Sequence, residues 1–260
     1  MPRDVIVISA RRIFDFKFDD LRLSMLSSET YRTQLQQLFH FTSVDVGTPT
    51  PTLLPVVAMD PPGLTFSMGE WVDPTDGTLI VVRHINVEPV RLVIDVAAPS
   101  SRIAGIYALL RAWADTIQVP DGGPCIGEPS DLHDLSEITA TLDLPLSALL
   151  EPSAIRALEK VRPDDVDGAD LQIVPTFNIR LVARGSEFQP GPSPPSFVLE
   201  HRSAVPVEDG RWYSNALLDT ERHLDVLAAL EAARGVVPKA RKSRSRHPAP
   251  RGRSRLGPPT

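Results

Sequence analysis

One cysteine and six histidines are the residues in this 260-residue chain best suited to nucleophilic or metal chemistry. Cys125 lies in a Gly-Gly-Pro-Cys-Ile-Gly loop, and His133 follows it in the sequence. A thiol becomes a nucleophile when a neighbouring base lowers its pKa or takes its proton. No signature of a cysteine enzyme surrounds Cys125, and partners in a catalytic site are spatial rather than sequence neighbours. We therefore expect a partly buried loop cysteine and predict no catalytic residue, since no Gly-x-Ser-x-Gly elbow supplies a serine instead.

The histidine spacing does not indicate a metal site. No His-x-His, His-x-x-x-His or His-Glu-x-x-His pattern occurs. The polar group from Asp131 to Glu137 is typical of a capped, solvated turn. Asp73 to Thr78 begins like a calcium loop, but Ile85 stands where that loop needs its distal glutamate. There is no Walker A sequence and no Gly-x-Gly-x-x-Gly, so we predict no metal and no cofactor.

The C-terminal segment Val236–Thr260, which we call the basic tail, is the strongest compositional signal. It contains no acidic residue, and serine, proline and glycine separate its charges, which is typical of a disordered arm that contacts phosphates without sequence choice. It has no aromatic residue, so we expect contacts with backbone phosphates rather than base stacking. The predicted anion- or nucleic-acid-binding residues are Lys239, Arg241, Lys242, Arg244, Arg246, Arg251, Arg253 and Arg255. A solvating extension, or a tail that folds back on the acidic remainder, is the alternative.

The rest of the chain is strongly acidic. The whole sequence has 27 basic and 33 acidic residues, so removing the eight basic residues of the tail leaves 19 against 33 and a formal charge of −14. This acidic body would attract basic partners over a distance. A single cysteine, and the lack of any stretch of about 20 apolar residues, favour a soluble cytoplasmic protein that does not cross a membrane.

The elements expected in the first half are mainly strands. Apolar runs and alternation predict short strands between Val5 and Met25, with a hairpin turn at Asp19-Asp20. Helical spacing predicts a helix over 29–39. An antiparallel meander is expected over 53–98, with a turn at Asp73–Gly77, and an apolar stripe predicts a helix over 101–117.

The second half repeats this order more loosely. After a Gly/Pro linker over 119–134, the sequence predicts strands near Ile138–Leu142, Leu171–Ala183 and Phe197–Val205, a helix near 152–161 and a last helix that ends before Gly235. The fold class is therefore α+β, a meander-rich antiparallel sheet with about four helices. Two similar halves, 1–118 and 135–235, followed by the tail 236–260, are one interpretation; a single sheet with helices on one face is the other.

The function expected from these features is binding or assembly without catalysis. The α+β body would contact a protein partner, another copy of itself included, and the tail would bind acidic partners or nucleic acid. An enzyme with a site assembled from scattered loop residues is an alternative, with Glu70, His84, Asp131, His133 and Glu137 as its candidates. An immunity or regulatory protein whose acidic body masks a basic partner is a third possibility.

Overall fold

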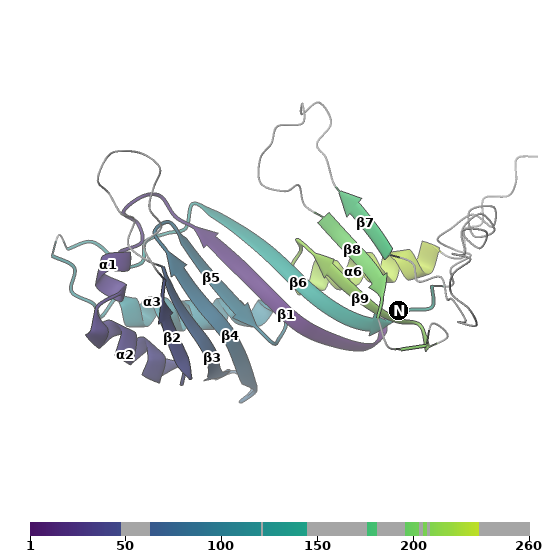
Figure 1. The fold of residues 1–260 in the computed structure, drawn as a ribbon, viewed down its shortest axis with the longest axis horizontal. Helices are drawn as coiled ribbons and strands as arrows, with labels where there is room; N and C mark the ends of the chain where they lie inside the picture. The colour runs from purple at the N-terminus through teal and green to yellow at the C-terminus, as the bar shows by residue number, and fades with distance from the viewer. Residues whose placement is uncertain are drawn as a thin grey trace, which may run out of the picture.

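The protein is built on one nine-stranded antiparallel sheet with helices on one side (Figure 1). The computed structural model describes residues 1–47, 63–120, 122–144, 176–180, 196–202, 205–206 and 209–233. The strand order is β2-β3-β4-β5-β1-β6-β9-β8-β7. The strands are β1 (Arg3–Asp15), β2 (Ser43–Val46), β3 (Leu64–Val72), β4 (Leu79–Glu88), β5 (Arg91–Val96), β6 (Asp131–Thr141), β7 (Thr176–Arg180), β8 (Ser196–His201) and β9 (Arg211–Ala216). The described α-helices are α1 (Leu23–Leu26), α2 (Glu29–Leu38), α3 (Ile103–Ala114) and α6 (Thr220–Ala233), and a short 3₁₀ turn (Ser100–Arg102) precedes α3.

The long strand β1 lies at the centre of the sheet, between β5 and β6. The hairpin predicted at Asp19-Asp20 is wrong, because β1 runs without interruption to Asp15 and the chain then turns into the short helix α1. Two consecutive arginines within a central strand conceal it from a hydrophobicity pattern. Arg11 pairs with Asp95 of β5, and Arg12 pairs with Asp134 of β6, so each charge is neutralised by a neighbouring strand.

Most of the other predicted elements coincide with the structure. The α+β class and the single antiparallel sheet are confirmed. Helix α2 starts after the N-cap Ser28, whose hydroxyl accepts a hydrogen bond from the Tyr31 amide. Strands β2 and β9 were not predicted, and β6 begins at Asp131, inside the stretch expected to be a linker. The part of the predicted meander up to residue 62, the helix predicted near 152–161 and the predicted tail lie outside the described residues.

The helices cover one face of the sheet, which we call the helix face. Alternate residues of the strands point into this layer and form the core. Phe14 of β1 stacks on Tyr107 of α3, with ring centroids 4.1 Å apart. A Cβ atom at Gly105 of α3 would stand 2.6 Å from the Trp71 ring, so only glycine allows this close approach of helix and sheet. Trp71 of β3 and Trp212 of β9 are both buried strand residues of the core.

Apart from β2, the two halves of the sheet have the same strand arrangement in mirrored order. The sequence β3-β4-β5-β1 is mirrored by β7-β8-β9-β6, and α3 follows β5 as α6 follows β9. The buried apolar residues form two clusters, one under each set of strands. Backbone pairing between β1 and β6 nevertheless makes the sheet continuous. Whether the halves arose as a duplicated unit stays a prediction.

The N-termini of the two main helices meet beneath the centre of the sheet and cap each other. The amide of Ser100 donates to Oγ1 of Thr220 at 2.9 Å, and the amide of Thr220 donates to Oγ of Ser100 at 2.9 Å. Both residues are buried, so neither amide can use water instead. This reciprocal cap satisfies two helix-terminal donors and joins residues 120 positions apart.

Ser100→Ala or Thr220→Val should each lower the free energy of unfolding by about 1–2 kcal/mol, because each change leaves one buried amide without an acceptor. Urea denaturation followed by circular dichroism measures the effect. Ser101→Ala is the matched control, since Ser101 is exposed and should change stability by less than about 0.5 kcal/mol. Equal effects at Ser100 and Ser101 would contradict the reciprocal cap.

Candidate functional site

The face of the sheet opposite the helices, which we call the open face, carries a buried ionic cluster. Asp95 of β5 is only 2% exposed, although its side chain lies on this face. Its carboxylate accepts hydrogen bonds from Ser9 Oγ at 2.8 Å and from Nε and Nη2 of Arg11 at 3.1 and 2.8 Å. His84 Nε2 lies 3.8 Å from the same carboxylate. Burial lowers the pKa of His84, against the opposing pull of Asp95, and the cations Arg11 and Arg83 lower it further.

A cavity of about 520 Å³ adjoins this cluster. Its lining combines the charged or ionisable side chains of Arg11, Arg83, His84 and Asp95 with apolar ones. We call it the open-face pocket. Its lining residues are Arg11, Ser67, Met68, Val81, Arg83, His84, Asp95 and Ala97.

A paired irregularity in β3 and β4 creates this pocket. The buried residues Val82 and Ile85 of β4 both belong to the core, so the two residues between them face the open side. The register with β5 shifts at this point, which is a β-bulge. Opposite it in β3, Met68 has a positive φ of 55°. Four pocket residues, Ser67, Met68, Arg83 and His84, are thus brought together by backbone irregularity and not by regular alternation.

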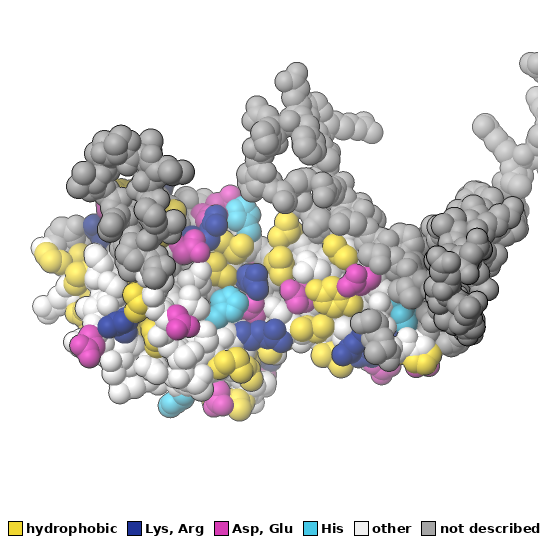
Figure 2. Space-filling model, viewed as in Figure 1, with side chains coloured by type: hydrophobic (Ala, Val, Ile, Leu, Met, Phe, Trp, Pro, Cys, Tyr) yellow, Lys and Arg dark blue, Asp and Glu magenta, His cyan; other side chains and the backbone are white. Residues whose placement is uncertain are grey.

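Figure 2 shows the open face as a mixed surface, with basic, acidic and histidine side chains interspersed with apolar ones. Several aliphatic side chains are exposed here. Ile6 is 52% exposed, and the cross-strand pair Val72 and Leu79 is 56% and 57% exposed. An antiparallel sheet can present a polar face to water, but exposed aliphatic groups on that face are typical of interaction surfaces.

The five candidate residues of the enzyme alternative lie on strands rather than loops, all on the open face. His133 contacts Asp15 at 3.3 Å and Asp131 at 3.4 Å. Glu137 accepts a long hydrogen bond from Asn215, while His84 belongs to the Asp95 cluster. No side-chain hydrogen bond or ion pair among the described residues joins these three places or involves the carboxylate of Glu70. The structure therefore brings together only Asp131 and His133 of the five.

Sequence reasoning missed a buried Ser-His-Ser arrangement. His223 of α6 contacts Ser136 Oγ through Nδ1 at 2.7 Å and Ser214 Oγ through Nε2 at 2.8 Å. The same hydroxyls also donate to the carbonyl oxygens of Leu218 and Val198. These four contacts need four protons, but two hydroxyls and a neutral imidazole supply three. Burial outweighs this shortage and lowers the pKa of His223 to about 4.

This arrangement resembles a nucleophile and base, yet no substrate can reach it. His223 and Ser136 are 0% exposed and Ser214 is 1% exposed. Phe197 also packs edge-on against the imidazole ring. Its role in the described structure is to anchor α6 on β6 and β9. No spacing in the sequence could indicate it, because the three residues come from three elements.

Cys125 and His133, the pair first considered for catalysis, do not form a site. Cys125 is 1% exposed, its carbonyl accepts from the Arg22 amide, and burial raises the pKa of its thiol to about 11. His133 is instead held by the carboxylates of Asp15 and Asp131 on the open face. The thiol therefore lacks both access and a base.

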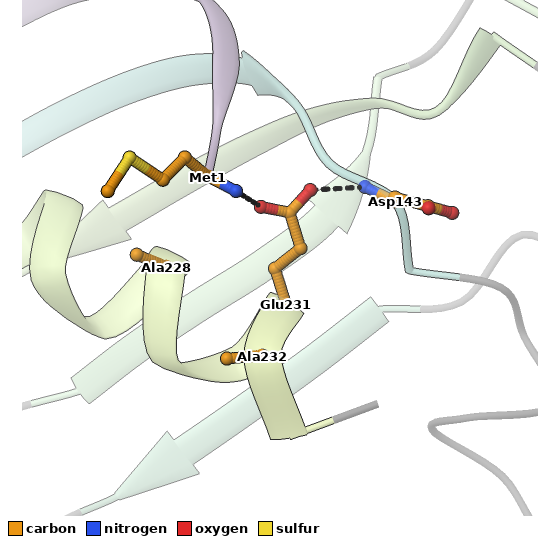
Figure 3. Close-up of a pocket in the computed structure, with 5 residues that line it drawn as sticks. All are labelled: Met1, Asp143, Ala228, Glu231 and Ala232. Atoms are coloured by element: carbon orange, nitrogen blue, oxygen red, sulfur yellow. Dashed lines mark hydrogen bonds and ion pairs between the residues drawn. The ribbon is translucent and has the colours of Figure 1, made fainter. Parts of the chain in front are cut away.

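A second cavity, of about 450 Å³, lies at the C-terminal end of α6 (Figure 3). Glu231 reaches across it and forms an ion pair with the Met1 ammonium at 2.5 Å. The other carboxylate oxygen accepts from the Asp143 amide at 3.0 Å. Both oxygens of Glu231 are thus occupied, and we assign this contact a structural role.

The remaining predicted sites are not tested by the described residues. The eight basic residues of the tail all lie outside them. Within the described residues, no group of three or more His, Cys, Asp or Glu side chains could hold a metal ion. No described helix has both the length and the apolar character needed to cross a membrane.

Comparison with known proteins found no matching family model, no matching curated protein and no matching solved structure. The functional argument therefore rests on the chain itself.

Acidification should destabilise the protein through His223. Its native pKa of about 4 lies below the unfolded value of 6.5, so its contribution is complete above pH 6.5 and is lost as the pH falls towards 4. We expect the free energy of unfolding, measured by urea titration, to fall by about 2 kcal/mol between pH 7.5 and 5. The His223→Gln variant should be less stable at pH 7.5, but its stability should change less with pH. The control is His84→Asn, which removes a second histidine with a lowered pKa and should retain most of the pH dependence of stability. A wild-type slope in His223→Gln would refute this assignment.

Cys125 should not react with a disulfide reagent in the native protein. At pH 8 we expect labelling at least about 100-fold slower than in 6 M urea, because the thiol is buried and its raised pKa suppresses the thiolate. Absorbance of the released chromophore measures the rate. Equal rates with and without urea would show an accessible, reactive thiol.

Proposed function

We propose that this protein is a non-catalytic binding protein whose open face receives a protein partner. One observation carries the proposal: α3 and α6 cover the helix face, while no described helix covers the other face, which displays aliphatic groups beside unpaired charge. The buried Ser-His-Ser arrangement argues against an enzyme that uses those residues. An exposed surface of mixed aliphatic and charged groups suits contact with another protein better than enclosure of a small substrate.

The basic tail would supply the electrostatic part of binding. Its eight cations are joined to a body of formal charge −14, so a partner that the tail attracts must carry acidic groups or phosphates. The tail would raise the rate of encounter, and the open face would supply the specific contacts. Nucleic acid is the competing partner for the tail, because phosphate backbones bind the same composition.

Site-specific photo-crosslinking in the expressing cells tests the open face. A photoreactive amino acid at Leu135, which is paired with Arg11 on this face, should give discrete crosslinked species. The same amino acid at Asp225, exposed on the outer side of α6, is the control and should give far fewer. Crosslinks from Asp225 alone would place the partner on the helices and refute the proposal.

A salt series with the full chain and a chain ending at Gly235 tests the tail. Anisotropy of a labelled DNA duplex should show binding by the full chain only. The logarithm of the binding constant should fall linearly with the logarithm of the salt concentration, with a slope of about −0.9 per phosphate contacted. DNA binding by the chain that ends at Gly235 would show that the body, and not the tail, contacts the DNA. Absence of binding in both would remove nucleic acid and leave acidic proteins as the partners of the tail.

A further inference from the structure

We propose that the open-face pocket binds an acidic, apolar peptide segment of the partner protein. A carboxylate of that segment would pair with Arg83, and a neighbouring aliphatic side chain would pack against Met68, Val81 and Ala97. The inference rests on the proposed function and names the chemistry of the partner.

Arg83 carries a positive charge that no described carboxylate neutralises through an ion pair. Each arginine lining or flanking the sheet centre is already paired: Arg11 with Asp95, Arg12 with Asp134 and Arg91 with Asp15. Among the described residues, no carboxylate forms an ion pair with Arg83. Among the described cations without an ion-pair partner, which include Arg3, Lys17, Arg32 and Arg202, Arg83 is the one that lines the pocket. Its guanidinium has the fork geometry that binds a carboxylate in bidentate fashion.

The pocket also offers exposed apolar side chains. Met68 is 57% and Val81 is 38% exposed, and both lie beside the cations. Beyond the pair of Glu70 and Val81, the exposed aliphatic residues Val72 and Leu79 form the next cross-strand pair on the same face. An extended peptide can cover the whole strip, whereas a small molecule in the pocket leaves Val72 and Leu79 in water.

The residues that line the pocket also favour an acidic, apolar peptide over other ligands. None of its eight lining residues is Phe, Tyr or Trp, and its one aromatic ring, the imidazole of His84, is partly buried beside Asp95, so the pocket offers little surface on which a nucleobase can stack. The basic tail is excluded as an occupant, because its eight cations would meet Arg83 and Arg11. A peptide with only carboxylates would leave the aliphatic strip uncovered, and an apolar peptide would leave Arg83 unpaired.

The test measures anisotropy of three labelled heptapeptides with the full chain. The first, Gly-Asp-Leu-Glu-Leu-Asp-Gly, supplies both chemistries; the second replaces its acids with amides, and the third replaces its leucines with serines. We expect the first to bind at least about tenfold more tightly than either of the others, which corresponds to about 1.4 kcal/mol. Equal affinity for the first and third peptides would overturn the apolar part of the proposal.

Variants locate the binding. Arg83→Glu should weaken the first peptide at least about tenfold, and Met68→Ser should weaken it about threefold or more, since each removes one kind of contact. Lys17→Glu is the matched control, because it changes the net charge equally at an exposed residue outside the pocket. Circular dichroism and urea titration of each variant establish that it is folded. Equal weakening by Arg83→Glu and Lys17→Glu would show charge steering alone and overturn the site.

Octanoate, which joins a carboxylate to an aliphatic chain, serves as the small-molecule probe. It should compete only at concentrations at least about 100-fold above those of the peptide. Octanoate binding as tight as the peptide would make the pocket a small-ligand site and overturn the peptide assignment. Leu135 lies next to Arg11 but does not itself line the pocket, so a partner that still crosslinks there while the peptide fails to bind would retain the proposed function and reject only this inference.

Discussion

The reciprocal cap between Ser100 and Thr220, together with the pairing of β1 with β6, fixes the arrangement of the two halves. Each apolar cluster has its own strands and its own helix, so neither core fixes the position of the other. The cap places both helix N-termini at one buried point, where any displacement leaves amides without acceptors. Since both helices start there, both are held on the same face, and no described helix lies on the opposite face.

The central strand β1 carries ion pairs on both faces of the sheet, the open face included. Arg11 and Arg12 point to opposite sides of β1 and are neutralised by β5 and β6 respectively. The Arg11–Asp95 pair, reinforced by Ser9, is therefore at once part of the sheet centre and one wall of the open-face pocket. A partly buried pair of this kind contributes less to stability than to specificity, because desolvation offsets much of its attraction. Its value here is a wall of fixed geometry beside Arg83, which forms no ion pair among the described residues.

Sequence predicted the elements whose signals are local and missed those whose core positions are polar. Helix α2 was predictable from its cap at Ser28 and its own spacing. Strand β9 was not, because Ser214 occupies a core position and breaks the apolar alternation. That serine is tolerated in the core only because His223 and a backbone carbonyl satisfy it, and these partners lie in other elements. For the site, His84 was named among candidates, but Arg83 and Met68 were not, since backbone irregularity brings them together.

The irregularity in β3 and β4 has a physical cost that helps to interpret the pocket. A regular ladder would place one of two consecutive residues on each face, whereas here Arg83 and His84 both avoid the helix face. Met68 also has a positive φ, which a residue with a Cβ atom rarely adopts without a loss of about 1 kcal/mol or more. Had Arg83 turned inwards, its charge would have entered the apolar core at a far greater cost. The bulge thus preserves the core, and its consequence is a cation held beside exposed aliphatic groups, a combination that only a partner of matching chemistry can cover without loss.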